Sequence, residues 1–413
     1  MSRLALIVVC FSLWIGSTAQ GLEPTTNWPR FRGPEGTGQS SAKDLPTKWS
    51  ASDVAWHVDL PVVGHSSPIV WGDKIFVTGT SQNGGAVNRH VVCVSRKDGK
   101  VLWNKVAAKG DGEQLHKMNS WATPSCATDG QRVVAFFGDG GLHCFDVDGE
   151  PMWSRDLGTF PGGWGVAASP VIIDSMVIQN CDATGDSYLL AVDKNTGKDV
   201  WRTSRREKPK GGWSTPILID TDGSQQLVLN GEFGVQAYHP KSGKPIWFCK
   251  SFIGRGTPAP AWGNGLLYVV NGKSGDVYAV KPDGTGDVTS TRMAWHTGRK
   301  GGRDLPSPIL ASDALVVVGM NGIATGYDPA GGRELWKERL GGNFSGSPIA
   351  ANGFIYIASE AGIVSVFKAG KTLEMVAQND SGVSSDEVVR SSLAIHNGQL
   401  LLRSDKRLYC IGK

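Results

Sequence analysis

The chain has 413 residues, of which 40% are hydrophobic and 19% charged, so it can bury a core and is not globally disordered. Its 55 glycines and 21 prolines fall short of the share typical of low-complexity chains and follow no collagen repeat. The net charge of +4 is spread without long runs of one sign, which excludes the basic surface of a nucleic-acid-binding protein.

The N-terminus has the pattern of a secretory signal peptide over residues 1–19. Arg3 precedes the apolar run 4–16, and the small residues 17–19 provide a cleavage site. This run is too short to span a bilayer, and no other run of the sequence reaches 18 apolar residues. We therefore expect an exported protein without a transmembrane segment, located in the periplasm or secreted.

Residues 20–52 are predicted to form an N-terminal arm. Within it, residues 27–38 contain three glycines and two prolines and consist mostly of loop-forming residue types. We expect this arm to pack on the folded domain. Contact between the arm and a partner is the alternative.

A repeated unit of roughly 40–50 residues occupies residues 53–413. Seven tryptophans end successive units, and five of them follow a glycine by four residues; the tryptophans are Trp56, Trp103, Trp153, Trp201, Trp247, Trp295 and Trp336. Eight units begin at a Ser-Pro or Thr-Pro pair or, in the last unit, at Ser-Leu; the starts are Ser67, Thr123, Ser169, Thr215, Thr257, Ser307, Ser347 and Ser392.

Each unit is predicted to be a four-stranded antiparallel sheet. In the unit that starts at Thr215, short apolar or alternating runs at 216–219, 226–230, 234–238 and 244–247 are separated by Gly, Asp and Asn turns. No stretch of the chain has a sustained helical period. The fold prediction is an all-β, eight-bladed β-propeller.

The two ends of the repeat region predict how the ring closes. The last unit stops at residues 412–413, where its fourth strand is missing, and a strand-like segment stands at residues 53–58 before the first unit. We expect this N-terminal strand to complete the eighth blade, which leaves no unpaired sheet edge at the seam.

The segment from Ala191 to Trp201 resembles the tryptophan-docking motif of the pyrroloquinoline-quinone (PQQ) repeat family, Ala-x-Asp-x-x-Thr-Gly-x-Glu-x-Trp, with Asp199 at the Glu position. Residues 27–38 resemble the leader that precedes PQQ-like propellers in exported bacterial proteins. The resemblance implies that each tryptophan packs on the backbone of the neighbouring blade. Blade 7 has Glu374 at the aligned place, so we expect a weaker junction there.

The resemblance implies two functional classes, quinone-dependent dehydrogenases and cofactor-free propellers such as the scaffold of the outer-membrane assembly machine. The dehydrogenases carry an adjacent cysteine pair, calcium and a catalytic Asp. None of the seven cysteines here is adjacent to another. We also expect Cys126 and Cys144 to stay unpaired, because the first and third strands of a blade lie about 9.5 Å apart, beyond the ~7 Å limit for a disulfide.

A candidate binding site lies at the position three residues before each start Pro, or before Leu393, because these loops face the central channel. The residues there are His65, Trp121, Ala167, Trp213, Arg255, Leu305, Ser345 and Arg390, with Trp164, Arg303 and Phe344 in the same loops. Aromatic faces and guanidinium groups suit a planar anionic ligand or a peptide carboxylate. The alternative is that these tryptophans pack between blades and these arginines are solvated or paired.

The sequence favours a non-catalytic, exported scaffold that binds an envelope or secreted protein or a small planar anionic ligand. The predicted binding residues are those of this funnel: His65, Trp121, Trp164, Trp213, Arg255, Arg303 and Arg390. The alternative is a PQQ- and calcium-dependent oxidoreductase that acts on an alcohol or a sugar, with the quinone in the funnel and Asp304 as the base. No metal site is predicted outside that alternative.

Overall fold

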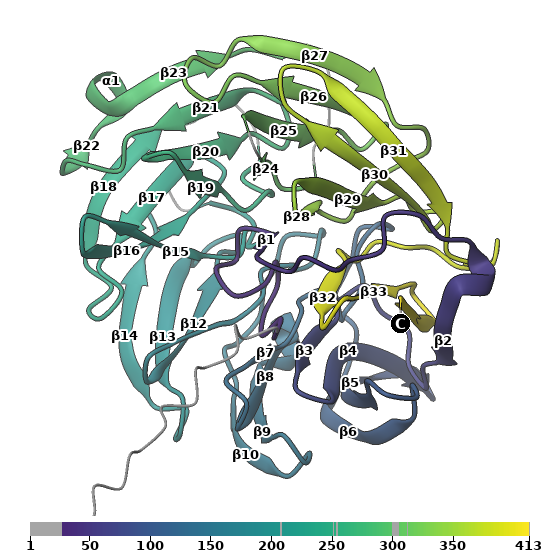
Figure 1. The fold of residues 1–413 in the computed structure, drawn as a ribbon. Helices are drawn as coiled ribbons and strands as arrows, with labels where there is room; N and C mark the ends of the chain where they lie inside the picture. Colours follow the sequence, from purple (N-terminus) through teal and green to yellow (C-terminus); the bar gives the residue numbers. More distant parts are fainter. Residues whose placement is uncertain are drawn as a thin grey trace, which may run out of the picture.

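The computed structural model describes residues 27–412 except 207–208, 251, 253–254, 300–304 and 312. The predicted signal peptide lies outside these residues. Eight antiparallel sheets surround a common centre, as Figure 1 shows, and the predicted all-β, eight-bladed propeller is confirmed. No helix in the described part of the chain has the length and apolarity needed to cross a membrane.

Blades 1 to 4 follow one another along the chain. Blade 1 consists of β3 (Ile69–Trp71), β4 (Lys74–Asn83), β5 (Ala86–Ser95) and β6 (Val101–Gly110). Blade 2 consists of β7 (Ala127–Thr128), β8 (Arg132–Phe136), β9 (Leu142–Asp146) and β10 (Pro151–Arg155). Blade 3 consists of β11 (Val171–Ile173), β12 (Met176–Cys181), β13 (Tyr188–Asp193) and β14 (Asp199–Ser204). Blade 4 consists of β15 (Ile217–Thr221), β16 (Ser224–Leu229), β17 (Gly234–Tyr238) and β18 (Pro245–Lys250), with β22 (Gly286–Asp287) added parallel to β18.

Blades 5 to 8 complete the ring. Blade 5 consists of β19 (Ala261–Gly263), β20 (Leu266–Val270), β21 (Val277–Val280) and β23 (Met293–Thr297). Blade 6 consists of β24 (Ile309–Ala311), β25 (Ala314–Val318), β26 (Ile323–Tyr327) and β27 (Glu334–Arg339). Blade 7 consists of β28 (Ile349–Ala351), β29 (Phe354–Ala358), β30 (Ile363–Ala369) and β31 (Leu373–Asp380), with β1 (Gln39–Ser40) parallel to β28. Blade 8 consists of β32 (Ala394–His396), β33 (Gln399–Arg403), β34 (Arg407–Ile411) and β2 (Val54–Asp59). The short helices are α1 (Thr289–Arg292) and the 3-10 turns Ala51–Asp53 and Gly138–Gly140.

The predicted closure of the ring is confirmed. Strand β2 pairs antiparallel with β34, with Trp56 opposite Cys410 and Asp59 opposite Arg407. The first described strand of the repeat region therefore supplies the fourth strand of blade 8. Apolar side chains fill the space between blades, for example Ile178 and Leu227 in the cluster that joins blades 3 and 4.

The repeated tryptophans join adjacent blades, as the resemblance implied. Six of the seven donate the indole N–H to a backbone carbonyl of the next blade, as Trp103 does to Val147 at 3.2 Å. The motif glycine of that next blade lies against the ring: a Cβ on Gly149, whose φ is +91°, would lie 2.8 Å from Trp103. Trp247 differs, because it donates to Gln226 of its own blade, and Gln226 donates in turn to the Pro282 carbonyl near blade 5.

The residue at the tryptophan position of blade 7 is Ala377, not Glu374, and the sequence alignment was wrong here. Ala377 lies opposite Val366, as Trp336 lies opposite Gly326 one blade earlier. The error arose because β30 and β31 stay paired up to Ala369 and Leu373, two pairs closer to the turn than β26 and β27 in blade 6, so counting along the chain misplaced the position. Glu374 instead forms an exposed ion pair with Lys368.

Trp49 of the N-terminal arm lies at the junction that lacks a docking tryptophan. Its indole Nε1 is 3.4 Å from the Ser381 hydroxyl, and its backbone N–H donates to the Asn379 side chain at 3.0 Å. The Asn379 amide donates back to the Thr47 carbonyl. Trp49 also packs on the apolar cluster of blades 7, 8 and 1. The arm thus provides an indole where blade 7 has none.

The earlier part of the arm crosses one end of the central channel (Figure 1). Trp28 pairs with Val70 in blade 1, and the buried Arg32 donates to the Pro308 carbonyl next to blade 6 at 2.8 Å. Strand β1 then pairs with β28 in blade 7. Phe31, in the middle of this crossing, therefore reaches the channel from one side.

Candidate functional site

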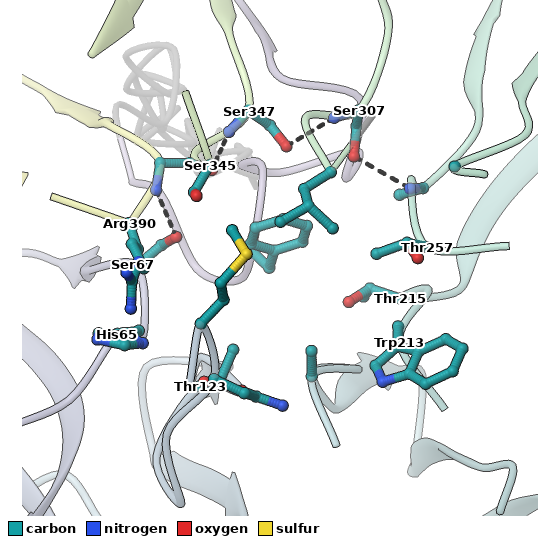
Figure 2. Close-up of a pocket in the computed structure, with 18 of the residues that line it drawn as sticks. His65, Ser67, Thr123, Trp213, Thr215, Thr257, Ser307, Ser345, Ser347 and Arg390 are labelled. Atoms are coloured by element: carbon teal, nitrogen blue, oxygen red, sulfur yellow. Dashed lines mark hydrogen bonds between the residues drawn. The ribbon is translucent and has the colours of Figure 1, made fainter. Parts of the chain in front are cut away.

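The channel wall is built from residues that stand two positions before the first strand of each blade. At seven of the eight blade junctions, the backbone N–H of this residue donates to the hydroxyl of its counterpart in the next blade, with N···O distances of 2.8–3.0 Å. We call these links the hydroxyl ring; its hydroxyls belong to Ser67, Ser125, Ser169, Thr215, Ser307, Ser347 and Ser392. Dashed lines in Figure 2 mark links of this ring at Ser67, Ser307 and Ser347. The eighth position of the ring is Ala259, which has no hydroxyl.

The hydroxyl ring surrounds a cavity of about 200 Å³ at the centre of the propeller. Phe31 of the arm lines it from one direction, and His116, Met118 and Asn119 of the β6–β7 loop (residues 111–126) also line it. Met118 and Arg390 line an adjoining hollow as well, together with Glu360. The cavity therefore lies between the arm and the β6–β7 loop.

The hydroxyl ring corrects the predicted channel-facing positions in two blades. The counterparts of Ser67 are Ser125 in blade 2 and Ala259 in blade 5, so the Thr-Pro pairs of these blades begin two residues earlier than the pairs elsewhere. The channel-facing residues of these blades are therefore Thr123 and Thr257, which line the cavity. Figure 2 shows both on the cavity wall.

The structure brings most of the predicted funnel residues to this cavity. Those that line it are His65, Trp164, Trp213, Arg255 and Arg390. Trp121 does not line it, and its predicted place was wrong because of the two-residue offset in blade 2. Arg303 and the candidate base Asp304 lie outside the described residues.

Trp121 instead holds the β6–β7 loop in place. Its indole N–H donates to the Glu113 carbonyl at 2.9 Å, and a Cβ on Gly112 would lie 2.4 Å from its ring. Glu113 in turn forms an ion pair with the buried Arg89 at 2.5 Å. These contacts fix the loop that carries His116 and Met118.

One side of the cavity is an aromatic and cationic wall. The Arg255 guanidinium carbon lies 3.7 Å from the centre of the Trp164 ring and 5.7 Å from that of Trp213, and these are cation–π distances. The His116 ring stacks on Trp164 with centroids 4.5 Å apart. The Trp213 indole N–H donates to the Gly165 carbonyl at 2.9 Å, which fixes the plane of that ring. This wall presents flat faces together with a positive charge.

The other side of the cavity carries His65 and Arg390, which Figure 2 shows one above the other with Ser67 between them. Arg390 Nη1 donates to the Lys117 carbonyl at 3.3 Å, and its Nε is 3.4 Å from a Glu360 oxygen. Burial, and then the charges of Arg390 and Arg403, lower the pKa of His65 to about 3. His65 is therefore a neutral imidazole near neutral pH.

Among the described residues, the cavity lining contains two arginines and two histidines but no carboxylate. Glu360 lines only the adjoining hollow. Neither does the described part of the chain contain a group of three or more His, Cys, Asp or Glu side chains able to hold a metal ion. These residues fit an aromatic anion, but they do not fit the calcium ion of the quinone-dependent alternative.

Sequence reasoning missed the hydroxyl ring, Phe31 and the β6–β7 loop. The Ser or Thr at each unit start was visible, but its link to the next blade appears only when the ring is closed. Phe31, His116 and Met118 reach the cavity from non-repeated segments, for which a repeat alignment has no signal. All six cysteines in the described residues are buried and unpaired, as expected for Cys126 and Cys144.

The profile of the family described as "Outer membrane protein assembly factor BamB" matches residues 38–178, 87–280 and 273–411, which together span nearly all of the described chain. The chain belongs to this family. The match agrees with the resemblance to the PQQ-repeat family that the docking tryptophans carry.

Curated BamB proteins are similar to this chain. BamB of Alkalilimnicola ehrlichii is 30% identical over 178 residues, which are 42% of this chain and 40% of that protein. BamB of Burkholderia pseudomallei is 26% identical over 287 residues, 65% of this chain and 68% of that protein. A polyvinylalcohol dehydrogenase of a Pseudomonas species is 25% identical over 369 residues, 70% of this chain and 55% of the dehydrogenase. The chain thus spans about half of the length of the first and last of these relatives.

Two solved structures have the same fold at low identity. BamB of Moraxella catarrhalis superimposes with a TM-score of 0.60 at 15% identity, over 86% of this chain and 98% of that one. The quinohemoprotein alcohol dehydrogenase of Comamonas testosteroni superimposes with a TM-score of 0.68 at 11% identity, over 94% of this chain and 80% of that one. The fold is therefore common to a BamB protein and an oxidoreductase, and function has to be argued from the cavity.

Proposed function

We propose that this protein is a non-catalytic binding propeller, exported to the envelope or secreted, whose central cavity takes a planar anionic ligand or a peptide carboxylate of a protein partner. The observation that carries the proposal is the composition of the cavity wall. Two tryptophans and two arginines line it, and no carboxylate of the described residues does. The names of the BamB relatives support a role in the envelope.

The cavity favours binding over turnover. A flat aromatic anion can lie against Trp213 while its charge is balanced by Arg255 or Arg390, and such pairing is strong where water is displaced. The same wall offers no described carboxylate as a general base, and the neutral His65 is flanked by two guanidinium groups that oppose its protonation.

Isothermal titration calorimetry with 2-naphthoate tests the proposal, with the uncharged 2-naphthamide as the matched ligand. We expect the wild-type protein to bind the carboxylate about tenfold or more tightly than the amide, because only the former pairs with the arginines. An Arg255→Ala/Arg390→Ala double variant should lose this preference and remain folded, whereas Arg339→Ala, at an exposed site on β27, should keep it. Equal affinity of the double variant and the wild type for 2-naphthoate would contradict the proposal.

The second candidate is a quinone-dependent oxidoreductase, which the similarity to polyvinylalcohol dehydrogenase favours. In that case Trp164, Trp213 and Arg255 would hold the planar, anionic quinone, which supplies the redox chemistry when bound. Adding PQQ and calcium to the purified protein tests it. A quinone absorbance band together with oxidation of an alcohol or a sugar would replace the binding proposal; PQQ binding without turnover would agree with it.

A further inference from the structure

The hydroxyl ring has one open link, and it lies on the aromatic wall of the cavity. At the other seven junctions each backbone N–H meets a hydroxyl of the next blade. The Thr215 N–H meets blade 5 at Ala259, whose methyl group accepts no hydrogen bond. Within the described part of the chain, the structure gives this N–H no acceptor. Thr215 and Ala259 are 4% and 2% exposed, and a buried N–H is rarely left without a partner.

The open link is not a distortion of blade 5. The N–H of Ala259 itself donates to the Ser307 hydroxyl at 3.0 Å, a normal link of the ring. Likewise the Thr215 hydroxyl accepts from the Ser169 N–H at 3.0 Å. The backbone of both residues therefore keeps the ring geometry, and only the accepting oxygen is missing.

The surroundings of the open link are those of an anion site. Figure 2 shows Trp213, Thr215 and Thr257 next to one another on one wall, opposite His65 and Arg390. Arg255, two residues before Thr257, lines the same cavity and lies over the Trp164 ring. Its backbone carbonyl accepts from the Gly272 N–H at 2.8 Å, which fixes the loop that carries it.

We propose that a carboxylate oxygen of the ligand occupies the place of the missing hydroxyl and accepts a hydrogen bond from the Thr215 N–H. Arg255 then balances the charge of the carboxylate, and the aromatic ring of the ligand lies against Trp213. This inference rests on the proposed binding function and assigns the ligand a carboxylate on an aromatic ring. A carboxylate suits the position because it is an acceptor only, whereas an amide or an alcohol also brings donors toward a wall of donors.

The Ala259→Ser substitution tests this assignment, because it supplies the hydroxyl that the other blades have. We expect the variant to bind 2-naphthoate at least about tenfold more weakly than the wild type in calorimetry, since its own hydroxyl now accepts the Thr215 N–H. Its melting temperature should be equal or higher, because the eighth link is closed. Ala167→Ser is the matched control: it adds the same hydroxyl to the same cavity, but the Ala167 N–H is already bonded to the Gly212 carbonyl.

The outcomes separate the inference from the proposed function. If wild type binds 2-naphthoate and Ala259→Ser binds it equally well, or if Ala167→Ser weakens binding as much, the carboxylate does not sit at the open link and the inference is overturned while the binding cavity stands. If wild type itself does not bind aromatic carboxylates, both fail. A selective loss in Ala259→Ser alone, with the fold intact, supports both.

Discussion

Two sets of contacts join the blades, and each is interrupted in a different way. The outer set consists of the docking tryptophans, and its gap at Ala377 in blade 7 is filled by Trp49 of the arm. The inner set is the hydroxyl ring, and its gap at Ala259 in blade 5 is filled by no described residue. The gap next to Trp49 is closed by the chain itself and therefore serves the stability of the ring. The missing acceptor at Ala259 lies on the cavity wall, where a ligand can supply it.

The largest effect is expected in the outer set. Trp201, which is 9% exposed, donates to the Pro240 carbonyl and packs on Gly243. Trp201→Ala should lower the free energy of unfolding by about 3–5 kcal/mol, because it removes a large buried side chain and leaves a cavity. Denaturant unfolding measures this loss. Val200→Ala, on the same strand at a site that is 48% exposed, should change it by less than about 0.5 kcal/mol. Similar losses in the two variants would mean that the tryptophan does not join the blades.

The inner set should contribute less per link. Ser347→Ala removes the acceptor of the buried Ser307 N–H and should cost about 1–3 kcal/mol in the free energy of unfolding. Ser224→Ala, at the exposed first position of β16, serves as the control for the substitution itself. An unfolding curve identical to that of the wild type would show that a hydroxyl link is dispensable, and the open link at Ala259 would then carry no meaning.

Trp49 is expected to contribute less to the free energy of unfolding than a docking tryptophan does. Trp49 is only partly buried and makes one weak indole contact, at 3.4 Å from the Ser381 hydroxyl. Trp49→Ala should therefore cost about 1–2 kcal/mol by the apolar area that it exposes. Unfolding of this variant beside Trp201→Ala compares the two. An unchanged stability would mean that the arm does not strengthen the junction of blades 7 and 8.

Between pH 7 and pH 6, the smallest effect on stability is expected from His65, beside the hydroxyl ring. Its pKa in the folded protein, about 3, lies below the usual value near 6.5, so the unfolded chain binds a proton that the native state does not. Stability is therefore complete above about pH 6.5 and falls as the pH drops toward 3. Between pH 7 and 6 the loss is below about 1 kcal/mol. His65→Gln should flatten this part of the stability profile; an equal slope in both proteins would contradict the assignment.

The sequence predicted the ring well because its signal is local and repeated. A glycine four residues before a tryptophan needs no knowledge of the neighbouring blade, and the lone strand before the first unit predicted the β2–β34 closure. The prediction was wrong where the place of a residue depends on how the strands pair. Because the Thr-Pro pair of blade 2 begins two residues early, Trp121 was assigned to the cavity, which it does not line. Because β30 and β31 stay paired closer to their turn than β26 and β27 do, Glu374 was assigned to the docking position. Neither offset is visible without the strand register.

The candidate site was predicted only in part, for the same reason. Trp213 and Arg390 stand at the channel-facing position of the repeat. In blade 5 that position belongs to Thr257, and Arg255, two residues earlier, nevertheless lines the cavity. Met118 and Phe31 come from segments outside the repeat, and only the folded chain brings them to the channel. The open link itself is the absence of one oxygen atom at Ala259, which has no meaning until the other seven links are known.

Amide hydrogen exchange at Thr215 tests the central claim most directly. In the ligand-free protein the Thr215 N–H should exchange faster than the N–H of Ser169 and Ser307, which are bonded to hydroxyls of the ring. Saturation with 2-naphthoate should slow Thr215 and leave the other two unchanged. Protection of Thr215 equal to theirs without ligand, or no change when ligand is bound, would contradict the claim that the open link is a ligand site.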